Sequence, residues 1–268
     1  MCIPDKLYIY YLKGKLKQDI ISEDYIGCWH EAGDSFLFFQ KKSDHIVDEL
    51  VASDNRLELK DIFEVDYFDW IGGKIETFGI GDIRIIPVWD KPKKLRDKDI
   101  LLDPSVVFGS GTHNTTYNCL VALDYIYEKE KDLDSVLDLG CGTGILSLFC
   151  AKKGANKIFS VDLNPLAVKA TKKNAKLNLL EEKILPIWGR AQDFFGIYTD
   201  VLVANMVFDV ISVIVNIFNL KKYRWLIFSG LFLHQVPEIE NILKGRGVSI
   251  VEIIGQESGW PTIMASSR

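Results

Sequence analysis

The stretch Asp138–Gly144, which reads Asp-Leu-Gly-Cys-Gly-Thr-Gly, constrains the fold of this chain more than any other feature. It follows an apolar run that predicts a strand over Ser135–Leu139, and it precedes a helical pattern over Ile145–Lys153. Glycines at such a turn permit positive φ and let the backbone approach a ligand closely. Asp162 ends the next apolar run, and an acid about 20 residues after the turn can accept hydrogen bonds from ribose hydroxyls. Together these features predict an α/β fold that binds a nucleoside-containing molecule.

The spacing of the glycines indicates which molecule that is. A dinucleotide-binding loop reads G-x-G-x-x-G and places a pyrophosphate on the helix N-terminus. This loop reads D-x-G-x-G-x-G, with Asp138 ahead of the first glycine. An acid suits a cationic group better than it suits phosphates, and S-adenosylmethionine carries an ammonium and a sulfonium but no phosphate. The loop therefore favours S-adenosylmethionine as cofactor, and an NAD-dependent oxidoreductase is the alternative from another class.

Strands and helices alternate along the chain beyond Asp134. Strand-like runs fall at residues 135–139, 157–162, 183–187, 200–205, 225–229, 248–254 and 261–266. Helical patterns lie between them at residues 145–153, 165–179, from 207 onward and around 237–243. Strands separated by segments of helix length imply βαβ units, so we predict a mainly parallel, doubly wound sheet.

The first hundred residues have a different pattern. Leu7–Leu12 and Ser35–Phe39 are aromatic and β-prone, and apolar residues recur at helical spacing between Ser43 and Ala52. This mixture predicts a small α+β domain, followed by an exposed, charged linker at Lys91–Lys98. We accordingly place the α+β domain at residues 1–88, the linker at residues 89–102 and the cofactor-binding domain at residues 103–268.

Composition narrows the setting. The formal net charge of −5 argues against a surface that coats DNA. The five cysteines form no CxxC pair, which is typical of reduced thiols in the cytosol. The N-terminus does not resemble a signal peptide, and the most apolar stretch, residues 206–220, is too short to span a bilayer of ~30 Å. We expect a cytoplasmic protein without a membrane segment, and no residues have the spacing of metal ligands.

A second loop, Phe108–Thr116, reads Phe-Gly-Ser-Gly-Thr-His-Asn-Thr-Thr. It precedes a helix predicted over Tyr117–Glu128, so its hydroxyl groups can cap that helix and also present donors to a ligand. A capping loop without a ligand is the alternative. His113 by itself is more often structural than catalytic.

Both loops, together with Val161–Pro165 and Val203–Asn205, resemble the ribosomal protein L11 methyltransferase family. Those enzymes use S-adenosylmethionine to methylate amino groups of a large-subunit ribosomal protein. The similarity continues in Pro87–Trp89, and also in Ser229-Gly230 and Gly259-Trp260. It implies a Rossmann-like, doubly wound, seven-stranded methyltransferase sheet. It also implies an N-terminal substrate-recognition domain, in which Leu12–Gly14 and Gly27–Glu31 are similar to the family.

The resemblance also implies roles for individual residues. Gly140 and its neighbours line the methionine part of the cofactor, Asp162 holds the ribose and Thr116 touches the cofactor. Asn205 lies beside the reacting methyl group and positions the amine, although an asparagine there could instead cap the helix that starts near Val207. The full set of implied cofactor-binding residues is Phe108, Gly111, Thr112, Thr115, Thr116, Asp138, Gly140, Gly142, Gly144, Asp162, Leu163 and Asn205, with Asn205 as the catalytic residue and no metal.

Three features bear on the substrate. Met206–Phe208 follows Asn205 where enzymes acting on planar amides or bases have two prolines and an aromatic ring, which favours an aliphatic amine. Trp70 is followed by Ile71–Lys74, so a second tryptophan of the family is missing. Ser110 and Asn114 stand where the family commonly has threonine and proline. A ribosomal protein is the expected partner. A lysine methyltransferase of another protein and a non-catalytic binding module stay as alternatives.

Overall fold

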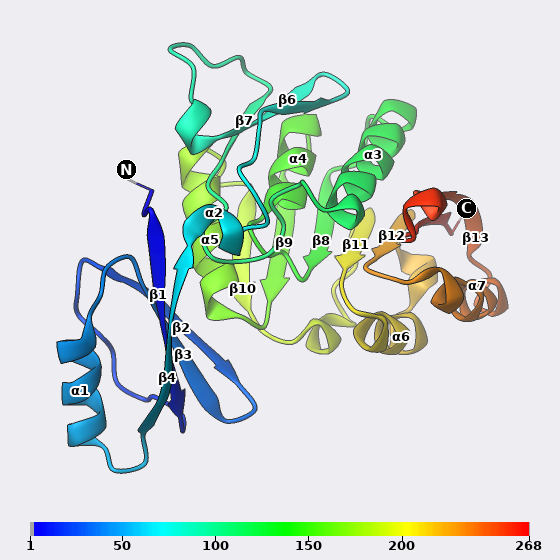
Figure 1. Ribbon diagram of the computed structural model, residues 1–268. Helices are drawn as coiled ribbons and strands as arrows, with labels where there is room; N and C mark the ends of the chain where they lie inside the picture. Colours follow the sequence, from blue (N-terminus) through cyan, green and yellow to red (C-terminus); the bar gives the residue numbers. More distant parts are fainter. Residues whose placement is uncertain (1–2, 268) are drawn as a thin grey trace. The chain divides into compact units, whose positions relative to one another are not determined.

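The computed structural model describes residues 3–267, which divide into two compact units (Figure 1). The first unit holds residues 3–74 together with Asn164–Leu166, and the second holds Ile75–Leu163 and residues 167–267. No helix within residues 3–267 is both long and apolar enough to cross a membrane. The domain limits at residues 88 and 103 stay a prediction.

The first unit is built on a four-stranded antiparallel sheet with the order β2-β3-β1-β4. Alternate residues of its strands, among them Tyr10, Leu37 and Phe39, form a core with Val47 and Leu50 of the first helix. The α+β character predicted for this part of the chain is therefore confirmed. The elements are β1 (Lys6–Lys13), β2 (Tyr25–Glu31), β3 (Asp34–Phe39), α1 (Asp44–Ser53), β4 (Glu58–Asp66) and α2 (Tyr67–Trp70).

The second unit is built on a seven-stranded sheet with the order β10-β9-β8-β11-β12-β14-β13. Neighbouring strands from β10 to β12 run parallel, and β14 is antiparallel to both of its neighbours. The strands are β8 (Ser135–Leu139), β9 (Lys157–Asp162), β10 (Ile184–Trp188), β11 (Val201–Asn205), β12 (Trp225–Ser229), β13 (Ser249–Ile254) and β14 (Thr262–Ser266). Each agrees within one residue with the strand predicted from the sequence.

Helices cover both faces of this sheet, which makes it doubly wound as predicted. One core contains residues of α3 (Asn114–Lys129), α4 (Ile145–Lys153) and α5 (Pro165–Leu177). The other contains residues of α6 (Phe208–Ile217) and α7 (Val236–Gly245). The short 3-10 helices are η1 (Val88–Asp90), η2 (Ala191–Phe194), η3 (Leu220–Lys222), η4 (Leu233–Gln235) and η5 (Gln256–Ser258).

A three-stranded sheet, β5 (Phe78–Ile80), β6 (Ile83–Pro87) and β7 (Asp99–Leu102), also belongs to the second unit. All four residues of β7 are buried, although they fall in the segment that we predicted to be a linker. The Arg84 guanidinium donates to both carboxylate oxygens of Asp99, at 2.8 and 2.6 Å. The Asn178 side chain bonds both backbone groups of Leu101, at 2.7 and 2.8 Å. These contacts fix the end of the segment in place.

The helix α3 begins at Asn114, three residues before the predicted start at Tyr117. The reason is its cap: His113 is the N-cap residue, and its ring nitrogen Nδ1 accepts a hydrogen bond from the Thr115 backbone at 3.3 Å. Capping rules favour Ser, Thr, Asp and Asn at this position, so the pattern gave no sign of a histidine cap. Thr115 and Thr116 consequently lie in the first turn of the helix.

The Gly230→Ala substitution tests how tightly the ends of β11 and β12 are joined. Gly230 has a φ of 87°, and a Cβ there would lie 2.2 Å from the carbonyl oxygen of Met206. The Met206 backbone is itself bonded to Ser229 at 3.0 Å and cannot move away. We expect the free energy of unfolding to fall by about 2 kcal/mol or more in urea titrations.

Gly196→Ala is the matched control, because no described atom lies within 4 Å of a Cβ at that position. It should change the free energy of unfolding by less than about 0.5 kcal/mol. Equal effects of the two substitutions would contradict the assignment of backbone crowding at Gly230.

Candidate active site

The residues singled out in the sequence meet at the carboxyl edge of the parallel strands. Leu139 at the end of β8 pairs with Val161 of β9 on one side and with Ala204 of β11 on the other. Asp162 and Asn205 are the next residues of those strands, and Gly140 follows β8. The chain reverses its direction of winding between β8 and β11, and open α/β sheets bind ligands at such a switch point.

The loop after β8 is shaped by backbone hydrogen bonds. Gly140 and Cys141 both donate to the Val161 carbonyl, at 2.8 and 3.1 Å. The backbone N–H of Gly142 donates to Oδ2 of Asp162 at 3.0 Å. The glycines at 140, 142 and 144 have φ values of 74°, 54° and 80°, which is the left-handed region that favours glycine. The loop therefore holds the half-buried Asp162 carboxylate at the site.

The second loop lies directly against the first. The Thr143 backbone donates to the Phe108 carbonyl at 3.0 Å, and the Thr143 hydroxyl donates to the Gly109 carbonyl. A Cβ on Gly142 would lie 2.3 Å from the Phe108 carbonyl oxygen, so a side chain has no room there. Residues more than 30 positions apart thus form one wall of the site.

The buried side-chain amide of Asn174, which was not singled out in the sequence, stabilises this wall by hydrogen bonds to the first loop and to Asp103, ahead of the second loop. Asn174 of α5 donates to the Asp103 and Thr143 carbonyls at 2.8 and 2.9 Å, and it accepts from the Asp103 backbone at 2.9 Å. The Thr171 hydroxyl donates to the Gly142 carbonyl at 3.0 Å. Both side chains are almost fully buried. The sequence does carry a signal for this role, because Thr171 and Asn174 are polar residues on the buried side of the helix predicted over residues 165–179.

Asp138 lies beneath the loop and is fully buried. Its Oδ2 accepts from the Ser147 hydroxyl at 2.5 Å, and Ser147 also lies 2.6 Å from the Ser160 hydroxyl. Its other oxygen, Oδ1, has no hydrogen-bond partner among the described residues. Burial raises the pKa of Asp138 to about 7. A buried carboxyl with one oxygen unmatched fits a cationic ligand nearby and does not fit a phosphate.

Asn205 is bonded to the first turn of α3, where the second loop ends, and not to the start of α6. Its Nδ2 donates to the Thr116 hydroxyl at 3.2 Å, and Thr116 is 1% exposed. The N-cap of α6 is Val207, and within the described chain no side chain caps it. The alternative role of Asn205 as the cap of this helix is therefore wrong. The bond engages the amide nitrogen of Asn205 as a donor, and the amide oxygen is by its chemistry an acceptor.

Aromatic rings form a rim that the sequence analysis did not identify. The His113 ring lies 5.5 Å from Phe108 and 5.0 Å from Trp260, and Trp260 lies 4.7 Å from Phe232. Phe108 and Phe232 are exposed. The rings come from segments about 150 residues apart. Phe108, His113 and Trp260 each lie in a segment named from the sequence, whereas Phe232 does not, and nothing in the sequence indicated that the four rings would meet.

The remaining predicted residues differ in their surroundings. Leu163 is exposed, and its carbonyl accepts from the exposed Trp188 indole at 2.9 Å. Thr112 is exposed and its hydroxyl lies 2.8 Å from that of Ser110. Gly111 and Gly144 are buried, and a Cβ there would crowd Phe78 or Thr171 at 2.6 and 2.8 Å. These two glycines therefore serve close packing within the protein.

Among residues 3–267, no group of three or more His, Cys, Asp and Glu side chains is placed to hold a metal ion.

Comparison with known proteins identifies the family of this site. Residues 24–268 match the model of the family described as Ribosomal protein L11 methyltransferase (PrmA). The chain belongs to this family. An L11 methyltransferase of Caldicellulosiruptor saccharolyticus is 34% identical over 76% of this chain and 68% of its own length. One of Agathobacter rectalis is 32% identical over 75% of this chain and 67% of its own length.

Solved structures share the fold. A ribosomal protein L11 methylase from Lactobacillus delbrueckii subsp. bulgaricus superposes with a TM-score of 0.56 at 24% identity, covering 71% of this chain and 97% of that one. The human methyltransferase 10 domain containing protein superposes with a TM-score of 0.51 at 16% identity, covering 63% and 89%. The Rossmann-like methyltransferase sheet predicted for this L11 methyltransferase family member is confirmed, and an NAD-dependent oxidoreductase is not favoured.

Asp138→Asn tests the buried carboxyl. The ordinary pKa of an aspartate is about 3.9, whereas that of folded Asp138 is about 7, so between these values the folded protein holds a proton that the unfolded chain has lost. Stability contributed by this group therefore falls as the pH rises from about 4 to about 7. The free energy of unfolding of the original protein should decline more steeply than that of the variant when urea titrations are compared at about pH 5 and about pH 8. Parallel curves would contradict the raised pKa.

Proposed function

We propose that this protein transfers methyl groups from S-adenosylmethionine to amino groups of ribosomal protein L11 in the cytoplasm. The observation that carries the proposal is the meeting of Asp162 and Asn205 at one sheet edge, each bonded to one of the two glycine-rich loops. The named relatives supply the substrate, because both are L11 methyltransferases.

Each end of the cofactor has a suitable partner in this site. Asp162, oriented by the Gly142 backbone, would accept hydrogen bonds from the ribose hydroxyls. The unmatched Oδ1 of Asp138 would balance the positive charge of the methionine end through the thin glycine backbone above it. When bound, S-adenosylmethionine would supply a methyl carbon on a sulfonium. The lone pair of the amine would form the C–N bond in line as the C–S bond breaks, a neutral thioether would leave, and the nitrogen would release its surplus proton to solvent, with no covalent enzyme intermediate.

Asn205, at the end of β11, would bind and orient the amine that receives the methyl group. A lysine side chain has a pKa of about 10.4, so it must lose a proton before its nitrogen has a lone pair to use. The aromatic rim of Phe108, His113, Trp260 and Phe232 keeps water from the amine, and desolvation favours the neutral form. The amide oxygen of Asn205 accepts an N–H of the amine and orients it. Orientation of this kind can supply roughly 7–11 kcal/mol.

Asp162→Ala should weaken binding of S-adenosylmethionine. Hydrogen bonds to a charged group contribute about 1.5–3 kcal/mol, so we expect the Kd from isothermal titration calorimetry to rise about 10-fold to 100-fold. Glu181→Ala, which removes an exposed carboxylate from the turn after α5, is the control and should leave the Kd unchanged. An unchanged Kd for Asp162→Ala would mean that the ribose contact is misplaced.

Asn205→Ala should lower kcat about 100-fold, because it removes a preorganised polar contact at the reacting centre. The Kd for S-adenosylmethionine should rise less than in Asp162→Ala, since the main proposed role of Asn205 concerns the amine. Thr116→Val, which removes the hydroxyl that holds the Asn205 amide, should lower kcat in the same direction but less. A normal kcat in Asn205→Ala would show that the amide does not position the amine.

The decisive experiment is transfer of a labelled methyl group onto a complete set of bacterial ribosomal proteins, followed by mass spectrometry of the modified residues. Label on lysine or N-terminal amines of L11 is the expected result. Label on a different protein would support methyl transfer to a protein amine but would show that L11 is not the substrate. Binding of S-adenosylmethionine without any methylated product would favour the non-catalytic binding module.

A further inference from the structure

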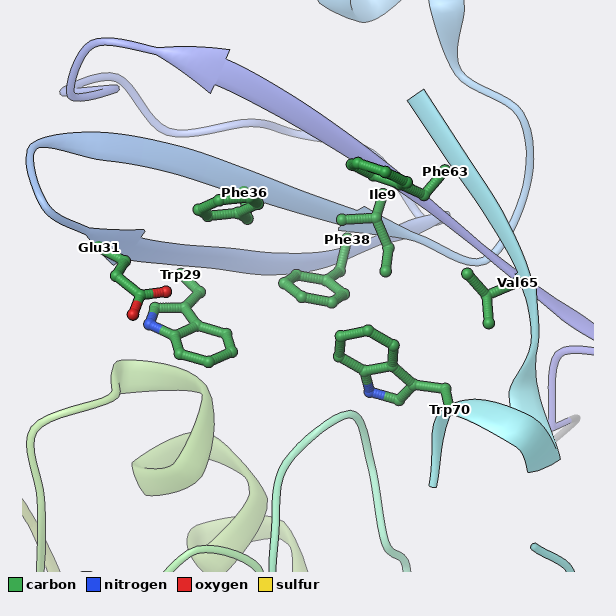
Figure 2. Close-up of a pocket in the computed structure, with 8 residues that line it drawn as sticks. All are labelled: Ile9, Trp29, Glu31, Phe36, Phe38, Phe63, Val65 and Trp70. Atoms are coloured by element: carbon green, nitrogen blue, oxygen red, sulfur yellow. The ribbon is translucent and has the colours of Figure 1, made fainter. Parts of the chain in front are cut away.

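The sheet of the first unit carries an aromatic pocket on the face opposite α1. Ile9 and Phe38 alternate along their strands with Tyr10, Leu37 and Phe39, which pack against α1, so they point to the other side. The pocket has a volume of about 290 Å³. The lining residues that matter here are Trp29, Glu31, Phe36, Phe38, Phe63 and Trp70 (Figure 2).

The rings surround a space instead of filling it. Phe38 lies edge-on to Trp70 with their ring centroids 5.5 Å apart, and Trp29 is tilted against Phe36 at 6.5 Å. Figure 2 shows the Trp29 indole, which comes from β2, and the Trp70 indole, which comes from α2, near the ring of Phe38, with the Glu31 carboxylate beside Trp29. Phe63 and Trp70 are 41% and 36% exposed, so the pocket is reachable from solvent.

This lining suits a cationic side chain. The faces of tryptophan and phenylalanine rings attract ammonium and guanidinium groups. Of the described residues that line the pocket, Glu31 alone is charged, and its carboxylate is placed to pair with the head of a lysine or arginine. The long aliphatic stem of such a side chain would cover the apolar floor at Ile9 and Phe38.

The charge distribution of the chain points to the same class of partner. Residues 1–74 contain 15 Asp and Glu against nine Lys and Arg, a formal net charge of −6. The other residues contain 22 acids and 23 bases, a net charge of +1. The negative charge of the protein is therefore concentrated in the first unit, where it would attract a basic partner and raise the rate of encounter.

We propose that this pocket holds a lysine or arginine side chain of the protein substrate as an anchor, while Asn205 serves the amine that is methylated. The inference rests on the proposed function for the identity of the substrate, but not for the chemistry of the pocket. It gives a role to Gly27–Glu31 and to Trp70, which were singled out in the sequence and which the methyl-transfer site does not use.

Steady-state methylation of purified L11 tests the anchor. Trp70→Leu should raise KM for L11 about fivefold or more, and Glu31→Gln about threefold at low ionic strength, with kcat unchanged in both. Glu49→Gln is the matched control: it makes the same charge change on an exposed position of α1, on the opposite face of the sheet, and should leave KM unchanged. A higher KM for Trp70→Leu with an unchanged KM for Glu31→Gln would indicate an apolar occupant and overturn the proposal.

A binding measurement separates failure of the anchor from failure of the proposed function. Short poly-L-lysine, followed by tryptophan fluorescence, should bind the original protein and Glu49→Gln equally, and Glu31→Gln and Trp70→Leu at least about threefold more weakly. This result would support the pocket even if L11 were not methylated. Equal binding of poly-L-lysine by all four proteins would overturn it even if L11 were the substrate. Circular dichroism melts would show that the variants are folded.

Discussion

The hydrogen bond from the Gly142 backbone to the Asp162 carboxylate, 3.0 Å long, joins the turn after β8 to the end of β9. The rest of the site depends on it in two ways. It fixes the direction of the only acidic side chain at the tip of β9, and it places Gly142 where the Phe108 carbonyl can pack against it without an intervening side chain. The loop is thus shaped largely by backbone groups and backed by Asn174 and Thr171, so most of its order precedes the arrival of any ligand.

Much of the second unit could be predicted from the sequence because its order is local. Each strand of a βαβ unit is followed by its own helix, so the pattern of apolar residues predicts where each strand ends. Asp162 and Asn205 are the last residues of their strands, and their positions could be predicted in this way. The start of α3 could not be predicted, because a histidine cap at His113 is outside the usual preferences. Two hydrogen-bonded contacts could not be predicted either: the one between Asn205 and Thr116, and the one between Asn174 and Asp103. Each joins segments that are distant in the sequence and meet only in the folded chain.

The first unit was harder to predict for the same physical reason. Its sheet places β1 between β3 and β4, so each contact of the central strand is with a segment distant in the sequence. The aromatic, β-prone runs indicated strands, but they did not indicate which face would carry α1 and which would carry Trp29 and Phe38. The two faces became distinguishable only when the helix was seen to cover one of them.

His113 performs two tasks with one ring. Its Nδ1 caps α3, and its ring makes edge-to-face contacts with Phe108 and Trp260 at the rim. Thr116, which holds Asn205, lies in the first turn of the helix that His113 caps. Replacing this histidine would therefore disturb the shape of the entrance and the position of the amide together, whereas Phe232 touches the rim without capping the helix. In proteins with this fold, a substitution at Phe232 could therefore change which acceptor is preferred without disturbing α3, whereas a substitution at His113 could not.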